Sequence, residues 1–267
     1  MLKTIHTDIN AKRLETAWYG PPPDDALTLV FLHEGLGCVE MWRDFPYRLA
    51  SATGCGLLIY SRLGYGRSDA CPLPRPIRFM HDEGLHILPE LLDRTGVKQC
   101  VLIGHSDGGS VGIIYAGGTP APPLRGLITE AAHVFCEEIS IRSIREARER
   151  YVRGDLRNKL EKYHGPNTDC AFWGWNDTWL HPDFKRWNLE EYLPNIQVPL
   201  LAIQGENDPY GSPAQLDAIV RQSGGKAKSL MISECGHSPH RDHGETTFQA
   251  MKDFIFSLRI TRPVSRG

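Results

Sequence analysis

The sequence VLIGHSDGGSVGIIYAGG, residues 101–118, joins a short apolar run to a glycine-rich segment. The apolar run is typical of a buried strand, and the segment through Ala116 is typical of a buried helix. Between them lie Ser106 and Asp107, and either side chain could act as a nucleophile. A serine would form an acyl-enzyme from an ester, whereas an aspartate would form an alkyl-enzyme from a halide or an epoxide.

The spacing of the glycines distinguishes these two candidates. A nucleophile on a sharp turn from strand to helix needs residues without bulk two positions before and after it. Around Ser106 these positions are Gly104 and Gly108, whereas around Asp107 the first of them is the bulky His105. The spacing therefore predicts Ser106 as the nucleophile, with the backbone N–H of Asp107 as an oxyanion donor. Glycine-rich turns that only connect a strand to a helix are also common, so a purely structural turn stays an alternative.

The composition is that of an ordinary soluble globular protein, with 41% hydrophobic and 23% charged residues in a chain of 267. The net charge of -2 provides no basic surface for nucleic acid or for a membrane, and no apolar run approaches the roughly 18 residues of a membrane helix. The amino terminus lacks the apolar core of a signal peptide. Seven cysteines without a CxxC motif indicate buried thiols in a reducing compartment. We therefore expect a cytoplasmic protein that acts on a small molecule without a cofactor or a metal, and the oligomeric state stays open.

Strand-like and helix-like segments alternate along most of the chain. Eight segments have the composition of strands: 3–9, 14–20, 27–33, 56–61, 99–104, 124–131, 199–205 and 227–233. A helix fits residues 79–96, although Pro89 would kink it or end it. This alternation predicts an α/β fold with a mostly parallel sheet and helices on both of its faces.

Residues 134–195 interrupt the alternation because they contain no convincing strand. We interpret them as an inserted helical cap, which leaves residues 1–133 and 196–267 as the core. Four of the six tryptophans fall in this segment, and we expect Trp173 and Trp175 to line a substrate pocket. His133 could face the same pocket. The alternatives are that each tryptophan packs the cap onto the core and that His133 is structural.

A serine nucleophile needs a base, a group that orients the base, and donors for the oxyanion. Asp208 and His237 each come just after a strand-like segment, as Ser106 does. The carboxyl ends of parallel strands meet at one edge of a sheet, so we expect these three side chains to converge there. Asp208 would then fix the tautomer of His237, and His237 would carry the proton from Ser106 to the leaving group.

The loop HEGLG at residues 33–37 is the candidate for the second oxyanion donor, because its glycines allow backbone N–H groups to point at a ligand. We expect Gly35 to provide that donor beside Asp107. We expect His33 to bond the backbone of the loop.

Two alternatives concern the same residues. Glu130 lies at the end of the strand-like segment 124–131 and could replace Asp208 as the acid of the triad. The segment HSPHRDH at residues 237–243 is close to a binuclear zinc motif, but its spacing differs by one residue, and His237 cannot easily be both a ligand and a base.

Five motifs together resemble the α/β-hydrolase superfamily: HEGLG (33–37), SRLGYGRSD (61–69), GHSDGG (104–109), GENDPYG (205–211) and CGHSPHRD (235–242). They are similar to those of small bacterial capped hydrolases, which include meta-cleavage-product hydrolases and carboxylesterases. The resemblance covers about residues 26–258. It implies an eight-stranded sheet with a helical cap inserted after the sixth strand, and the order Ser, Asp, His along the chain agrees with it. Glu34 departs from the glycine usual at its position, and GHSDGG differs from the GNSMGG of meta-cleavage hydrolases.

From these residues we expect a serine hydrolase of the carboxylic ester type, which cleaves a small ester or lactone through an acyl-enzyme. One alternative is a C–C bond hydrolase that acts on a vinylogous diketone with the same triad. The other is a ligand-binding protein of the same fold with little turnover.

Overall fold

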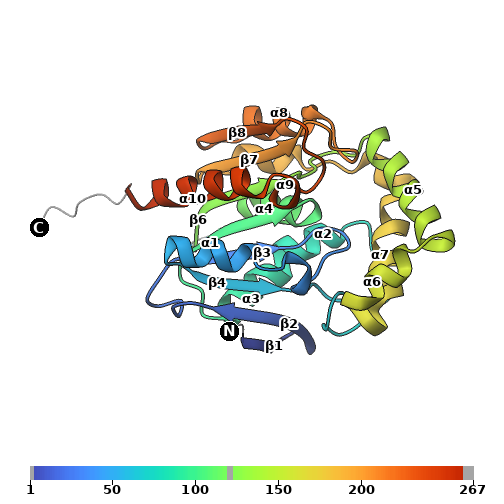
Figure 1. Cartoon of the computed structure of the whole chain (residues 1–267), viewed down its shortest axis with the longest axis horizontal. Helices are drawn as coiled ribbons and strands as arrows, with labels where there is room; N and C mark the ends of the chain where they lie inside the picture. Colours follow the sequence, from blue (N-terminus) through green and yellow to red (C-terminus); the bar gives the residue numbers. More distant parts are fainter. Residues whose placement is uncertain (1–2, 119–122, 261–267) are drawn as a thin grey trace, which may run out of the picture.

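The computed structural model describes residues 3–118 and 123–260 of the chain. Within them a single eight-stranded sheet has the order β1-β2-β4-β3-β5-β6-β7-β8 (Figure 1). Its strands are β1 (Lys3–Ile9), β2 (Lys12–Tyr19), β3 (Thr28–Leu32), β4 (Gly56–Tyr60), β5 (Cys100–His105), β6 (Leu124–Glu130), β7 (Leu200–Gly205) and β8 (Ala227–Ile232). The β1–β2 and β2–β4 pairs are antiparallel and the other five pairs are parallel. The predicted strands and the predicted mostly parallel sheet are therefore confirmed.

The central strands are buried because both faces of the sheet are covered. On β3, Leu29 and Phe31 belong to one hydrophobic cluster, whereas Val30 and Leu32 belong to the other. This alternation follows from the two-residue repeat of a strand. It explains why these strands appear in the sequence as continuous apolar runs.

Helices cover both faces of the sheet, as predicted (Figure 1). On one face α1 (Phe45–Thr53) packs beside α10 (Gly244–Ile260), through residues such as Leu49 and Met251. On the other face lie α3 (Leu88–Arg94), α4 (Asp107–Gly118) and α8 (Pro213–Gln222). None of the helices in the described residues is both long enough and apolar enough to span a bilayer.

The segment 79–96 is helical, but it is not a single α-helix. It consists of α2 (Phe79–Asp82), a π-helical turn over Glu83–Ile87, and α3, in which Pro89 lies in the first turn. Proline has no N–H to donate and its ring clashes with the preceding turn, so the widened turn precedes Pro89 and a new helix begins there. The expected interruption at Pro89 is confirmed.

Three α-helices lie between β6 and β7: α5 (Glu138–Arg153), α6 (Leu156–His164) and α7 (Thr168–Trp179). All three fall inside the segment 134–195, which contributes no strand to the sheet of the described residues. Figure 1 shows them together on one side of the sheet. Trp175 and Trp179 belong to the same buried cluster as Val111 of α4, so the inserted helices pack onto the core.

Candidate active site

Ser106 occupies the sharp turn between β5 and α4. Its φ angle of 52° lies in the left-handed region, which is strained for a residue with a side chain. A Cβ on Gly104 would lie 2.3 Å from the carbonyl oxygen of Gly108. A Cβ on Gly108 would lie 2.0 Å from the carbonyl oxygen of Leu32. Both positions therefore need glycine, as the spacing argument centred on Ser106 requires.

The structure brings together the three residues that the sequence suggested as a triad. The hydroxyl of Ser106 lies 2.9 Å from Nε2 of His237, and Nδ1 of His237 lies 2.8 Å from Oδ1 of Asp208. An ionised carboxylate only accepts hydrogen bonds, so Nδ1 carries the proton and Nε2 is free to accept from the serine.

Asp208 is held as a charged acceptor. Its carboxylate also accepts hydrogen bonds from the Gln204 side chain at 2.7 Å and from the Tyr210 backbone at 2.8 Å. Burial raises the pKa of Asp208, but the His237 imidazole and the backbone donor outweigh it, so the pKa is lowered overall. Asp208 therefore stays ionised at neutral pH and can stabilise a protonated His237.

Glu130 does not bond His237. Its Oε2 accepts from Nδ1 of His240 at 2.8 Å and from the His240 backbone at 3.1 Å. Burial raises the pKa of Glu130, but the neighbouring His240 more than compensates and lowers it. Glu130 therefore anchors α9 (Pro239–Asp242), which follows His237, whereas the carboxylate that bonds His237 is that of Asp208.

His105 supports the loop that carries His237. Its Nε2 lies 2.7 Å from the backbone oxygen of His237, and burial lowers its pKa to about 4. The ring is therefore neutral at neutral pH, with Nε2–H donating to the carbonyl. This contact fixes the backbone that carries the catalytic candidate His237.

Two side chains hold the backbone of the loop HEGLG in place. His33 Nδ1 bonds the Glu34 carbonyl at 2.7 Å, as expected, and Arg62 donates to that carbonyl at 2.8 Å. Glu34 has no positive φ angle, which explains why this position accepts a residue other than glycine. Gly35 is required for another reason, because a Cβ there would lie 2.3 Å from Nε1 of Trp175.

The side chain of Asp107 is completely buried beside the nucleophile. Its Oδ1 accepts from the Trp179 indole at 3.2 Å, and its Oδ2 lies 3.8 Å from the Arg62 guanidinium. Burial raises the pKa of Asp107, and Arg62 opposes that rise. As the first residue of α4, Asp107 has a backbone N–H with no helical acceptor, which leaves it available to a ligand.

A cavity of about 270 Å³ opens above Ser106. It is lined from the core by Glu34, Gly35, Leu36, Met41, His105, Ser106, Asp107, His133, Tyr210, His237 and Ser238, and from the inserted helices by Ser140, Ile144, Ala147, Arg150, Leu156, Leu160, Trp175 and Trp179. Trp175 and His133 are thus where the sequence analysis placed them. His133 is neutral there, since burial lowers its pKa to about 4, and its Nε2 bonds the Tyr210 carbonyl at 3.1 Å.

Trp173 is the exception among the expected pocket residues, because it does not line this cavity. Its ring packs against Tyr151 and Phe172, with the Arg148 guanidinium 5.2 Å from its centre. Successive helical residues are turned by about 100°, so residues two apart point to nearly opposite sides. Trp173 therefore faces away from the cavity that Trp175 lines, and we correct its expected placement.

The histidines of residues 237–243 do not converge. His237 bonds Asp208, His240 bonds Glu130, and His243 lies 3.3 Å from the Glu234 carbonyl. In the described parts of the chain, no three His, Cys, Asp or Glu side chains are grouped so that they could hold a metal ion.

Several residues of the site were not found from the sequence. Trp179 and Tyr210 line the cavity, and Arg62 bonds the carbonyl of Glu34, which also lines it. Trp179 lies one helical turn after Trp175, and this i, i+4 spacing was a usable signal. Arg62 and Tyr210 have no comparable local pattern.

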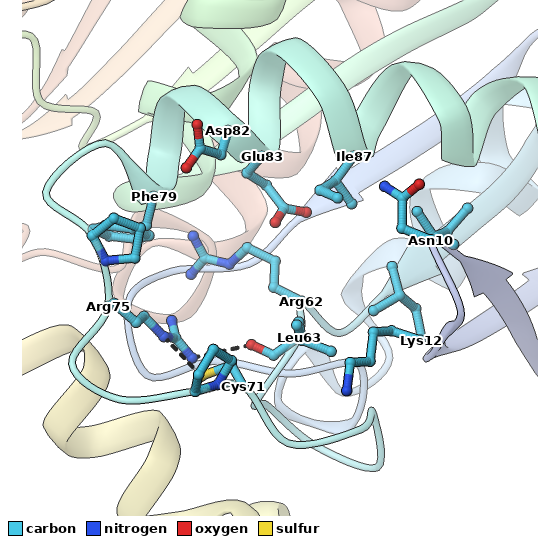
Figure 2. A pocket seen from close by; sticks show the side chains of 14 residues that line it. Asn10, Lys12, Arg62, Leu63, Cys71, Arg75, Phe79, Asp82, Glu83 and Ile87 are labelled. Atoms are coloured by element: carbon cyan, nitrogen blue, oxygen red, sulfur yellow. Dashed lines mark hydrogen bonds between the residues drawn. The ribbon is translucent and has the colours of Figure 1, made fainter.

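A second cavity, of about 280 Å³, lies between the β1–β2 turn, the loop after β4 and α2 (Figure 2). Its lining includes Leu14, Leu63, Phe79 and Ile87, and no member of the Ser106, His237 and Asp208 set. The cavity is mostly apolar, and Cys71 and Arg75 also lie in its wall.

Comparisons with known proteins agree with this architecture. The sequence model described as the alpha/beta hydrolase family matches residues 29–250. The structure is similar to a carboxylesterase from Nitrososphaera gargenis, with 14% sequence identity, coverage of 97% of this chain and 100% of that chain, and a TM-score of 0.79. It is similar to an esterase from Exiguobacterium antarcticum, with 17% sequence identity, coverage of 96% of this chain and 100% of that chain, and a TM-score of 0.75. It is also similar to an enol-lactonase from Burkholderia xenovorans LB400, with 19% sequence identity, coverage of 94% of this chain and 100% of that chain, and a TM-score of 0.71. No curated protein sequence gives a significant match. The family match spans most of the chain, so this protein belongs to the alpha/beta hydrolase family.

Proposed function

We propose that this hydrolase is a serine esterase that cleaves small carboxylic esters or lactones through an acyl-enzyme. The observation that carries the proposal is the continuous relay from Ser106 Oγ to His237 Nε2 (2.9 Å) and from His237 Nδ1 to Asp208 (2.8 Å). The similar structures include those of esterases and of an enol-lactonase, which is consistent with this proposal.

Acylation begins when His237 Nε2 takes the proton of the Ser106 hydroxyl and the serine oxygen attacks the ester carbonyl. The backbone N–H groups of Asp107 and Gly35 donate to the oxyanion of the tetrahedral intermediate. His237 then gives its proton to the leaving alkoxide as the C–O bond breaks, which leaves the acyl group on Ser106.

Deacylation repeats these steps with water. His237 takes a proton from the water as its oxygen attacks the acyl carbonyl, and it returns the proton to Ser106 as the acid leaves. Asp208 stabilises the imidazolium that forms in both halves of the reaction.

The cavity limits the substrate to compact groups. Its volume of about 270 Å³ lies just below the range of drug-sized ligand pockets. In this proposal residues 134–195 act as the cap, because Ile144, Leu160 and Trp175 form its apolar roof. Acyl and alcohol parts of a few carbons each would fit beneath it.

The acyl-enzyme itself provides the test. Wild-type protein mixed with p-nitrophenyl butyrate is expected to gain the mass of one butyryl group on the peptide that contains Ser106, and a fluorophosphonate is expected to label the same residue. The His237→Ala variant serves as the control, because it keeps the serine but has no base to activate it. A wild-type protein that neither turns over the ester nor reacts with the fluorophosphonate would exclude the esterase mechanism and favour a binding role.

A further inference from the structure

The carboxylate of Glu34 is the unusual feature of the cavity. It lines the cavity beside Ser106, with 18% of its side chain exposed. Within the described residues no other residue donates a hydrogen bond to it, and its one ionisable partner within 4 Å is His105 Nδ1, at 3.9 Å. His105 is neutral at neutral pH, because burial lowers its pKa to about 4, so it does not balance the charge.

Glu34 is ionised at neutral pH. Burial raises its pKa, but the neighbouring His105 and Arg241 side chains more than offset that rise, so the pKa is lowered overall. The other two carboxylates of the site have partners, since Asp107 lies beside Arg62 and Asp208 bonds His237. The negative charge of Glu34 is therefore the one left to face a bound substrate.

Aromatic faces surround the same space. Trp175 lies against Gly35, next to Glu34, and Trp179 and Tyr210 also line the cavity. The one lysine or arginine of the lining is Arg150, an exposed residue of α5, so solvent screens its charge. A carboxylate together with aromatic rings in a mostly apolar cavity is the chemistry that recognises ammonium groups.

We propose that Glu34 is a specificity residue that selects esters with an ammonium group close to the scissile bond and rejects matched anionic esters. This inference rests on the esterase activity proposed above. Glu34 would act by contact with the substrate and would take no part in proton transfer.

Three acetyl thioesters with the same two-carbon linker provide the test: acetylthiocholine, its neutral carbon isostere, and the anionic S-acetyl-3-mercaptopropionate. For the wild type, kcat/KM is expected to be about tenfold higher for the cation than for the isostere, and lower again for the anion. Glu34→Gln should bring the three values close together. Glu40→Gln, which changes an exposed residue outside the cavity, should keep the wild-type order.

The outcomes separate the two proposals. Equal wild-type rates for the cation and its isostere, or a preference that survives in Glu34→Gln, would overturn the role of Glu34 and leave the esterase intact. Hydrolysis of p-nitrophenyl acetate without hydrolysis of any thioester would also overturn the role of Glu34 and leave the esterase proposal standing. Loss of activity on every ester, with no labelling of Ser106, would reject the esterase and this inference with it.

A second and independent observation concerns two cysteines. Sγ of Cys71, in the loop after β4, lies 2.9 Å from Sγ of Cys170 in the first turn of α7. Non-bonded carbon atoms, which are smaller than sulfur, settle at about 3.5–4.0 Å. The two thiols are therefore closer than ordinary packing allows, and they join the core to the inserted helices.

The surroundings favour reaction at this pair. Arg75 donates from Nε to Cys71 Sγ at 3.2 Å, and Figure 2 shows its guanidinium beside that sulfur. The hydrogen bond from Cys71 lowers the pKa of Cys170 to about 6, although burial opposes this. The first proton of the pair is therefore lost easily, and both thiols are only partly buried.

The geometry points to a disulfide-forming site between Cys71 and Cys170 that takes oxidised glutathione or a similar small disulfide as its oxidant. The thiolate attacks one glutathione sulfur and releases one glutathione thiolate. The second cysteine, as its thiolate, then attacks the mixed disulfide and releases the other. The chain loses two protons and two electrons, and one oxidised glutathione becomes two reduced molecules.

Incubation with oxidised glutathione, followed by tryptic digestion without reductant, tests this site. The wild type is expected to give a linked peptide that contains both cysteines, which disappears after dithiothreitol. Cys71→Ser and Cys170→Ser should not give it, whereas Cys136→Ser, which removes another half-buried thiol, should. Persistent free thiols, or glutathione adducts without a link, would contradict the proposal.

Discussion

Replacing Ser106 by alanine is expected to lower kcat/KM for p-nitrophenyl acetate by at least about 10⁴-fold. Alanine keeps the shape of the turn but removes the oxygen that lies 2.9 Å from His237 Nε2. Initial rates of p-nitrophenolate release, with circular dichroism to confirm folding, provide the measurement.

The matched variant is Asp107→Asn. Asparagine has the same shape, and its oxygen can still accept from the Trp179 indole, so we expect activity within about tenfold of wild type. Some stability should be lost, because Arg62 loses the charge beside it. If Asp107→Asn were inactive and Ser106→Ala retained turnover, the nucleophile would be the aspartate and the chemistry would be that of halides or epoxides.

The strands and the turn at Ser106 could be predicted because their causes are local. An apolar run such as 101–104 needs burial on both faces whatever its neighbours are, and a residue at φ 52° needs glycine at close backbone approaches. The alternation of these runs with helices was enough to predict the parallel sheet and the position of the inserted segment.

The supporting contacts could not be predicted because they join segments far apart in the chain. Arg62 reaches Glu34 across 28 positions, and Cys71 meets Cys170 across 99. No local pattern reports such pairs. The error at Trp173 had a different cause. The helical repeat already showed that Trp173 and Trp175 point to opposite sides of α7, but the sequence did not show which side faces the cavity.

Glu130 shows that position along the chain does not identify which acid bonds which histidine. It ends β6 beside β5, which carries the nucleophile, so it was a reasonable candidate for the triad acid. Which histidine each acid meets depends on the path of the segment 237–243, and α9 in that segment brings His240 to Glu130.

Replacing Asp208 by asparagine is expected to reduce kcat by about 10³–10⁴-fold. The amide nitrogen would face Nδ1 of His237 as a donor and favour the tautomer with its proton on Nε2. That tautomer cannot accept the proton of Ser106. Steady-state kinetics with p-nitrophenyl acetate measure the loss, which should appear in kcat because the apolar walls of the cavity are unchanged.

Glu130→Gln separates the two acids, because it removes a charge that has no contact with His237. It should keep kcat within about tenfold and lower the free energy of unfolding by about 1.5–3 kcal/mol, as the charged hydrogen bonds to His240 become neutral ones. Urea unfolding measures the second effect. If Glu130→Gln instead lost the activity and Asp208→Asn kept it, the acid would be Glu130, and the 2.8 Å contact between Asp208 and His237 would only be structural.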